Sequence, residues 1–306
     1  MKIFIIGAGA IGKTLAVALK LSDKDVVLVR GSVDDGSRSV EKFEVVTIDG
    51  AKLQAEIEVG TFSRLSALEG VIVLTNKSFG NDNLARTLDA KTKNSPLVIL
   101  QNGLGVERPF IDRDFPEVYR CVLFVTSQMI STNQIRFRQV TISPIGMIKG
   151  SQANLRSVVE QLDSPVFQFK AETDIQTVIW MKAIINSVFN SICPLLEIDN
   201  GVFHREAQVL DIAKRVIAEC AAIAKENGID LEADEIVERL LLISKSSDGQ
   251  LISTLQDINN KRPTEIETLN FEIANSARIL NKENTVAETR LLGELTRLKS
   301  VLSRSN

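Results

Sequence analysis

The turn between the first apolar run and the first amphipathic stretch constrains this chain most. Residues 2–7, KIFIIG, have the composition of a short buried strand, and residues 12–24, GKTLAVALKLSDK, have helical periodicity. A second apolar run, DVVLVR, follows at residues 25–30. This order predicts a β-α-β unit, in which the two strands lie parallel in one sheet.

The turn itself has the pattern G-x-G-x-x-G, with glycines at positions 7, 9 and 12. Such a turn between a strand and a helix is typical of dinucleotide binding, because backbone amides and the helix N-terminus approach a pyrophosphate there. A purely structural glycine turn is the alternative. The residues predicted to contact the cofactor here are Gly7, Ala8, Gly9, Ala10, Ile11 and Gly12.

The second apolar run ends in Arg30, where NAD-binding proteins of this type usually carry an acidic residue. A guanidinium pairs with a ribose 2′-phosphate, whereas a carboxylate repels it. Arg30 therefore predicts NADPH/NADP over NADH/NAD, the alternative being a solvated arginine at a strand end.

The two halves of the chain differ in pattern. Further β-type runs occur at 71–76, 97–103, 121–126 and 166–171, and an alternating run at 134–143 predicts an antiparallel addition. From about Asp174 onward, helical periodicity dominates. We therefore expect an α/β protein with an N-terminal Rossmann-type doubly wound sheet, residues 1–173, and an all-helical C-terminal domain, residues 174–306. The junction has no Gly/Ser linker, which predicts a firm interface with a cleft.

Composition excludes several functions. The net charge of −3 and the absence of a dense basic run argue against nucleic acid and membrane surfaces as partners. The apolar start is too short for a signal peptide, and we find no run of ~20 apolar residues that would span a membrane. Three separated cysteines and one histidine, His204, which we expect in a loop, predict neither a disulfide framework nor a metal site. A cytoplasmic protein is expected.

A polar stripe interrupts the apolar segment WMKAIINSVFN at residues 180–190. Lys182, Asn186 and Asn190 recur every four residues, so they lie along one side of a helix. A solvated helix face is the alternative, but Asn is a poor helix former and apolar residues flank the stripe closely. Lysine can protonate a developing alkoxide, and the amides can fix hydroxyl and carbonyl oxygens. We therefore interpret the stripe as a substrate-binding surface.

Several motifs now follow one another along the chain: GAGAIG, TNKS with Lys77, QNGLG, W-x-K-x-x-x-N-x-x-x-N from Trp180, and STLQDINNKRPTEIE from Ser253. Together they make the chain resemble the ketopantoate reductase (2-dehydropantoate 2-reductase) family over essentially its whole length. The resemblance implies a Rossmann domain and a helical domain like the C-terminal one of 6-phosphogluconate dehydrogenase, with the active site between them. It also implies NADPH-dependent reduction of a small 2-oxo acid, ketopantoate, to pantoate, for pantothenate and coenzyme A biosynthesis.

The resemblance also assigns roles to single residues. Lys182 matches the general acid, and Glu265 the glutamate that supports this lysine and the cofactor. Asn102 matches a residue that meets both nicotinamide nucleotide and substrate, and Lys77 a cofactor-binding lysine. The matching substrate-binding residues are Asn102, Lys182, Asn186, Asn190, Asn200 and Ser253. Without the resemblance, residues 262–267, RPTEIE, would predict only the start of a helix.

The sequence departs from the family pattern at Ser191, Pro263 and Phe271, beside the chemistry rather than in it. Two alternatives therefore stay open: a paralogue that reduces another branched 2-oxo acid, and a non-catalytic NADP(H)-binding sensor. Turnover with other 2-oxo acids would mark the first, and nucleotide binding without turnover the second. A monomer and a homodimer through the helical domain both fit the sequence.

Overall fold

A computed structural model describes residues 1–31, 33–92 and 94–305, and its contacts divide the chain into two compact units. The sheet unit comprises Met1–Gln101 and Val106–Ile175. The helical unit comprises Gln176–Asn306 together with the short segment Asn102–Gly105. A Rossmann-type sheet followed by a helical domain is the predicted fold class, and it is confirmed.

The described residues of the sheet unit form one eleven-stranded mixed sheet, with the order β11-β10-β7-β6-β5-β1-β2-β4-β3-β9-β8. Its centre is parallel: β1 lies between β2 and β5, and β6 and β7 continue the parallel run. The strands are β1 (Ile3–Ile6), β2 (Val26–Arg30), β3 (Arg38–Val46), β4 (Lys52–Thr61), β5 (Val71–Leu74), β6 (Leu97–Ile99), β7 (Val118–Cys121), β8 (Val125–Ser131), β9 (Gln134–Gln139), β10 (Ser143–Lys149) and β11 (Phe169–Glu172).

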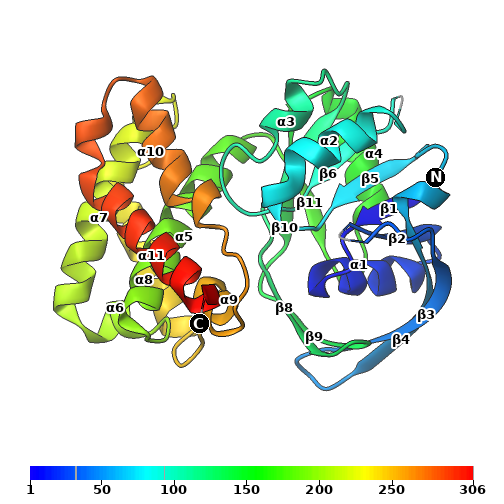
Figure 1. Ribbon diagram of the computed structural model, residues 1–306, viewed down its shortest axis with the longest axis horizontal. Helices are drawn as coiled ribbons and strands as arrows, with labels where there is room; N and C mark the ends of the chain where they lie inside the picture. The colour runs from blue at the N-terminus through cyan, green and yellow to red at the C-terminus, as the bar shows by residue number, and fades with distance from the viewer. Residues whose placement is uncertain (32, 93, 306) are drawn as a thin grey trace. The chain divides into compact units, whose positions relative to one another are not determined.

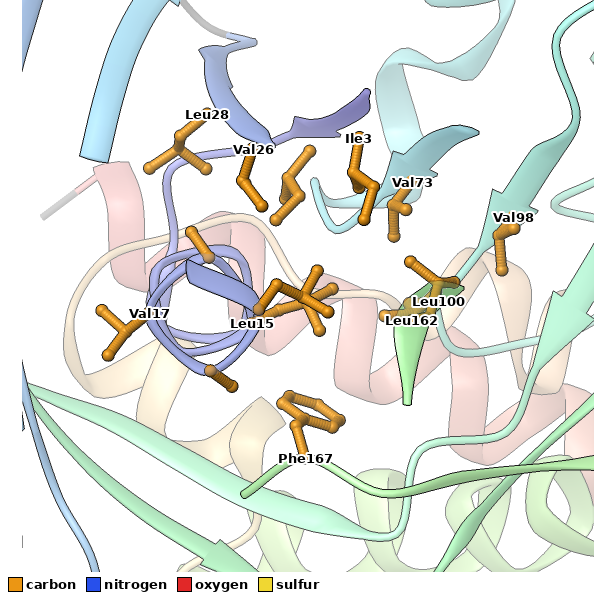
Figure 2. Close-up of a cluster of buried hydrophobic side chains, with 14 of the residues drawn as sticks. Ile3, Leu15, Val17, Val26, Leu28, Val73, Val98, Leu100, Leu162 and Phe167 are labelled. Carbon is orange, nitrogen blue, oxygen red and sulfur yellow. The ribbon is translucent and has the colours of Figure 1, made fainter. Parts of the chain in front are cut away.

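Side chains that alternate along each central strand fill two separate cores, one on each face of the sheet. Ile3 and Ile5 join the core under helix α1 (Ala10–Lys20) and α4 (Gln152–Leu162), which Figure 2 shows with Leu15, Leu162 and Phe167 around the strands. Phe4 and Ile6 join the other core, under α2 (Asn81–Asp89) and the short α3 (Arg108–Ile111). Burial on both faces explains why these strands are continuous apolar runs.

Two parts of the sheet differ from the sequence prediction. The antiparallel hairpin β3–β4 was not predicted, because polar and charged residues interrupt the apolar positions of both strands. The run at 121–126 is not one strand: β7 ends at Cys121 and β8 begins at Val125. The predicted antiparallel addition at β9 is confirmed by its pairing with β8, although β9 also pairs parallel with β3.

In the helical unit the long amphipathic helices α7, α10 and α11 pack against one another (Figure 1), and α11 contacts α5 (Ile175–Leu196), since the Thr296 hydroxyl donates to the carbonyl oxygen of Ser191. The other helices are α6 (Val202–Arg205), α7 (Ala207–Glu226), α8 (Ala233–Ser246), α9 (Ser253–Asn259), α10 (Asn270–Ile279) and α11 (Ala287–Ser305), and short 3₁₀ turns occur at η1 (Phe62–Arg64), η2 (Ser78–Gly80), η3 (Ile266–Thr268) and η4 (Glu283–Thr285).

Helix α5 bears on the expectation that no apolar run of this chain spans a membrane. Over the described residues it is the one helix long and apolar enough to cross a membrane by length and composition alone, with a mean hydropathy of 1.3. However, 72% of its most apolar stretch of 18 residues is buried inside the protein. The core helix of a folded domain passes the same test, and the buried Val188, Phe189 and Ile192 of α5 belong to such a core.

Candidate functional site

The glycine turn lies between β1 and α1, and its three glycines differ in how much space is available for a side chain. Gly7 has φ +119°, and a Cβ there would lie 2.6 Å from the backbone nitrogen of Asn76. A Cβ on Gly12 would lie 2.0 Å from the carbonyl oxygen of Gly7. Gly9 differs, because a Cβ there would meet nothing within 4 Å. Gly7 and Gly12 are therefore required by packing, whereas Gly9 leaves open space at the start of the helix.

The N-terminus of α1 carries no side-chain cap and no acidic residue in its first turn. Its first amide groups and the partial positive charge of the helix end thus lack a side-chain acceptor from the cap position. Such a helix end next to open space suits a phosphate.

The segment after β5 closes this turn from the side. The hydroxyl of Thr75 lies within hydrogen-bonding distance of the carbonyl oxygens of Ile6 (3.1 Å) and Gly7 (2.9 Å). Asn76 donates its amide to the carbonyl oxygen of Lys77 at 2.9 Å, while its own Oδ1 is buried without a hydrogen-bond partner in the described part of the chain. Lys77 itself is exposed. The sequence reasoning singled out Lys77 but missed Asn76, whose signal is its position at the carboxyl end of the strand beside β1.

Arg30, at the end of β2, already has a carboxylate partner. Its Nη2 donates to Glu41 Oε1 at 2.5 Å, and its Nη1 donates to the hydroxyl of Ser37 at 3.2 Å. Ser39 donates to the same Glu41 oxygen at 2.9 Å. A 2′-phosphate bound to Arg30 would therefore share the guanidinium with Glu41, a residue on β3 that sequence reasoning missed.

A second cation, the Lys13 ammonium, lies near Arg30 and Glu41. The Lys13 ammonium is buried, donates to the carbonyl oxygen of Thr132 at 2.6 Å and lies 4.8 Å from the centre of the Phe43 ring. Burial lowers the pKa of Lys13; the Glu41 carboxylate opposes this shift and the Arg30 charge adds to it. Both cations thus act in the same electrostatic neighbourhood as Glu41.

The polar stripe of the helical unit lies on α5, as predicted. Asn190 is buried, whereas Lys182 and Asn186 are half-buried, so this is not the fully solvated face of the alternative interpretation. Ile185 and Phe189, which flank the stripe, are buried, and so is Trp180 at its beginning.

Asn190 joins α5 to the beginning of α9. Its Oδ1 accepts hydrogen bonds from the hydroxyl of Ser253 and from the backbone N–H of Thr254, both at 3.3 Å. The residue before α9, Ile252, offers no side-chain cap, so Asn190 supplies the missing acceptor from another helix. The structure thus brings together two predicted substrate-binding residues that lie 63 positions apart, and it adds Thr254.

Asn200 is held in the loop after α5 by its backbone. Its N–H donates to Gln250 at 2.9 Å, and its carbonyl oxygen accepts from the Ser244 hydroxyl at 2.7 Å. The Oδ1 of Asn200 is buried and has no hydrogen-bond partner among the described residues. Because leaving a buried polar atom unpaired is costly, this oxygen fits a donor group on a ligand.

An ionic network beside Asn200 fixes the same loop. Asp199 accepts hydrogen bonds from the backbone of Gly201 at 2.7 Å and from the Arg205 guanidinium at 2.9 Å. Hydrogen bonding by Arg205 holds the pKa of Asp199 well below its usual range. His204 lies in the short helix α6, rather than in the expected loop, and its Nδ1 is 3.0 Å from the Ser244 hydroxyl.

The segment with Asn102 packs against the turn with Glu265. The N–H of Leu104 donates to the carbonyl oxygen of Thr268 at 2.8 Å, and the Thr268 hydroxyl donates to the carbonyl oxygen of Glu265 at 3.1 Å. Gly103 has φ +96°, and a Cβ there would lie 2.3 Å from the Thr268 hydroxyl oxygen. Glycine is therefore required at this approach. Glu265 does not start a long helix, because only the 3₁₀ turn η3 follows it and α10 begins at Asn270.

The predicted site residues thus fall into two groups. Gly7 to Gly12, Arg30 and Lys77 belong to the sheet unit. The helical unit contains Asn102, Lys182, Asn186, Asn190, Asn200, Ser253 and Glu265. Asn102, which the sequence placed in the first domain, is grouped with the helical unit by its contacts.

A strand-turn-helix at the start of a parallel sheet, followed by a helical domain with a partly buried polar stripe, defines a two-domain architecture with a Rossmann-type sheet. Comparison with known proteins narrows this class. The family model described as ketopantoate reductase PanE/ApbA matches residues 3–150, and the model of its C-terminal domain matches residues 174–297. The chain therefore belongs to the ketopantoate reductase family.

The sequence relatives agree with this assignment, and solved structures match the fold. A 2-dehydropantoate 2-reductase from Pyrococcus horikoshii is 27% identical over 287 residues, which cover 92% of this chain and 93% of the relative. The fold also matches a dimeric ketopantoate reductase from Staphylococcus aureus, with a TM-score of 0.81 and 20% identity over 99% of this chain and 100% of the other. It matches D-mandelate dehydrogenase in complex with NADH and anilino(oxo)acetate, with a TM-score of 0.83 and 19% identity over 99% of both chains.

Proposed function

We propose that this protein reduces 2-dehydropantoate to pantoate with NADPH, and thereby contributes to pantothenate and coenzyme A biosynthesis. Family membership and the names of the relatives support the reaction. The observation that carries the proposal is local to the helical unit: Asn190 is engaged with the start of α9, and the nearby loop presents a buried, unpartnered amide oxygen on Asn200.

The sheet unit fits a dinucleotide by its own geometry. The open space at Gly9, the uncapped start of α1 and the unpartnered oxygen of Asn76 offer donors to a pyrophosphate and an acceptor beside it. When bound, the reduced nicotinamide supplies the hydride. The proposed cofactor-binding residues are Gly7, Ala8, Gly9, Ala10, Ile11, Gly12, Arg30, Lys77, Asn102 and Glu265.

The helical unit supplies the remaining requirements of 2-oxo acid reduction. Lys182 donates the proton to the oxygen that becomes an alkoxide, and Glu265 supports its charge. Since the oxygen of Asn190 is engaged, its amide group acts as a donor towards the substrate, together with Asn186. Asn102 and the buried oxygen of Asn200 complete the set of substrate contacts. Ser253, whose hydroxyl donates to Asn190, lies at the start of α9, where the partial positive charge of the helix end favours a substrate carboxylate.

The preference for NADPH rests on Arg30 and Lys13, two cations in one corner of the sheet unit. Glu41 weakens this preference, because a carboxylate that pairs with Arg30 competes with a phosphate for the same donors. We therefore propose NADPH as the preferred cofactor, with a selectivity over NADH that Glu41 reduces.

The decisive experiment is an absorbance assay with purified protein, NADPH and 2-dehydropantoate. Consumption of NADPH that depends on 2-dehydropantoate is the expected result. NADPH binding without turnover of any 2-oxo acid would instead identify the sensor alternative.

A second candidate is reduction of a different 2-oxo acid. The fold match to D-mandelate dehydrogenase shows that the same architecture occurs in a dehydrogenase for an aryl-substituted acid. Branched aliphatic and aryl 2-oxo acids should therefore be tested in parallel at equal concentration. A higher kcat/KM with one of these acids than with 2-dehydropantoate would favour this candidate.

We further propose a cytoplasmic homodimer that associates through the helical unit. Cys121, Cys193 and Cys220 are all buried and form no disulfide among the described residues, as expected for a reducing compartment. Burial raises the pKa of Cys193 and of Cys220 to about 12, so neither thiol is poised to react. The dimeric relative from Staphylococcus aureus supports the assembly.

A further inference from the structure

Helix α11 has its apolar and polar sides exchanged relative to an ordinary surface helix. The residues that it buries against the helical unit are small, and most are polar: Thr289, Gly293, Thr296 and Ser300. Besides arginines, it exposes five large apolar residues: Leu291, Leu295, Leu298, Val301 and Leu302. A surface helix normally directs its apolar side towards the core, so α11 carries an apolar face that the described chain does not cover.

The contacts of the buried side fix the rotation of α11 about its axis. The Glu219 carboxylate of α7 accepts the backbone N–H groups of Glu288 at 3.0 Å and Thr289 at 2.8 Å, and the Thr289 hydroxyl at 2.7 Å. One turn later, a Cβ on Gly293 would lie 2.9 Å from the Asn270 Cβ. The leucines therefore cannot turn inward without breaking a helix cap and a close helix contact.

The exposed leucines form a regular stripe. Leu291, Leu295, Leu298 and Leu302 are spaced by four, three and four residues, the pattern of the a and d positions of a heptad. At 100° per residue they fall within an arc of roughly 60°, and the buried residues lie roughly 160° away. Their exposed fractions are 55, 43, 53 and 61%, so the stripe is open along all its length of about 16 Å.

The charges beside the stripe fit a second copy of the same helix. Glu294 lies on one side of the leucines and Lys299 on the other, five residues later. In two parallel helices that pack through such a stripe, this spacing places Glu294 of each copy near Lys299 of the other. Within one chain Arg290 pairs with Glu294 at 2.9 Å and Glu197 with Lys299 at 2.8 Å, so the borders carry no excess of one sign that would repel a copy.

We propose that two copies of this chain associate through α11, with the Leu291–Leu302 stripe of one copy packed in parallel against the same stripe of the other about a two-fold axis. The contact is isologous, because the same residues serve on both sides. Leu196, exposed and next to the Glu197 that pairs with Lys299, extends the apolar surface at one end. The inference gives a surface to the homodimer proposed above, and it is independent of the reductase chemistry.

The test measures the mass of the full-length protein by sedimentation at several concentrations. The wild-type protein should be a dimer, and Leu298→Glu should raise the dimer dissociation constant at least about 30-fold, the effect of losing one interface hot spot. Leu242→Glu, at a leucine on α8 that is at least as exposed as Leu298, should leave the dimer intact. Circular dichroism checks folding, and Leu302→Glu in the last turns replaces Leu298→Glu if the latter does not fold.

A wild-type monomer, or a dimer broken by Leu242→Glu and not by Leu298→Glu, would overturn the proposal. NADPH turnover is measured on the same samples, so a monomeric but active protein would refute the interface without affecting the proposed reaction. A dimer that is inactive would support the interface and contradict the proposed reaction.

The parallel alignment has its own test. Because the three native cysteines are buried, a cysteine introduced at Leu291 is the accessible thiol. In the parallel arrangement the two introduced cysteines face each other, and mild oxidation should link the dimer covalently. An antiparallel pair would separate them by about 16 Å along the helix. A Leu298-dependent dimer that does not cross-link would therefore refute the parallel alignment.

Discussion

In the sheet unit the candidate phosphate-binding turn is made of backbone, whereas in the helical unit the candidate site is made of side chains. The turn from Gly7 to Gly12 offers amide groups, and its sequence signal is the absence of side chains. The α5 stripe offers an ammonium and two amides on a helix whose other residues are mostly apolar. Adding a side chain to the turn should impair it, whereas the stripe should be impaired by removing a side chain. Opposite kinds of substitution should therefore reduce function in the two units.

Removal of the proposed acid should have the largest effect. Lys182→Ala should lower kcat by about 10²–10⁴-fold, because the alkoxide loses its proton donor. Binding of NADPH, measured by fluorescence titration, should change little. Lys214→Ala, at an exposed lysine of α7, is the matched control and should retain full activity. Near-normal turnover of Lys182→Ala would dismiss its role as the acid.

Substitution by alanine should have different effects at two glycines of the same turn: on NADPH affinity at Gly9 and on stability at Gly12. Gly9→Ala should fold normally, since its Cβ meets nothing within 4 Å, yet raise the Kd for NADPH about 10- to 100-fold by filling the phosphate position. Gly12→Ala should lower the free energy of unfolding by about 1–3 kcal/mol, because its Cβ would overlap the Gly7 carbonyl. Thermal unfolding and NADPH titration of both variants provide the measurement. Unchanged NADPH affinity in Gly9→Ala would exclude this turn as the phosphate site.

Cofactor selectivity should respond in opposite directions at the two members of one ion pair. Arg30→Asp should reduce the ratio of kcat/KM for NADPH over NADH by about 10- to 100-fold, and Glu41→Gln should raise it about 2- to 5-fold. Glu58→Gln is the control, since Glu58 pairs with Arg38 further along the same hairpin. If the ratio stayed constant in all three variants, the 2′-phosphate assignment would be wrong.

The smallest effect is expected from the loop beside Asn200. The pKa of Asp199 is lowered in the folded protein, so its stabilising contribution is present above the unfolded pKa and is lost as the pH falls through the folded value. Asp199→Asn should therefore lower the melting temperature at neutral pH, and the difference from wild type should shrink below about pH 4. Melting curves across this range test the sign, and a constant difference down to strongly acidic pH would contradict it.

Part of this molecule follows from local sequence. The alternation of Ile3 and Ile5 with Phe4 and Ile6 predicts a strand buried on both faces, and the four-residue spacing on α5 predicts one polar stripe. The hairpin β3–β4 escaped prediction because polar and charged residues interrupt the apolar positions of both strands. The length and hydropathy of α5 do not distinguish a core helix from a membrane span, and burial by neighbouring helices does.

The sequence by itself determined the β-α-β start, the glycine turn, the change to helices near Asp174 and the positions of Lys182, Asn186 and Asn190. These features depend on periodicity and backbone freedom over a few residues. Only the tertiary structure decided that Glu41 pairs with Arg30, that Asn190 meets Ser253, and that the leucines of α11 face outward. Each of these facts depends on which surfaces of distant segments pack together, and local periodicity shows that a helix has two faces without showing which one the rest of the chain covers.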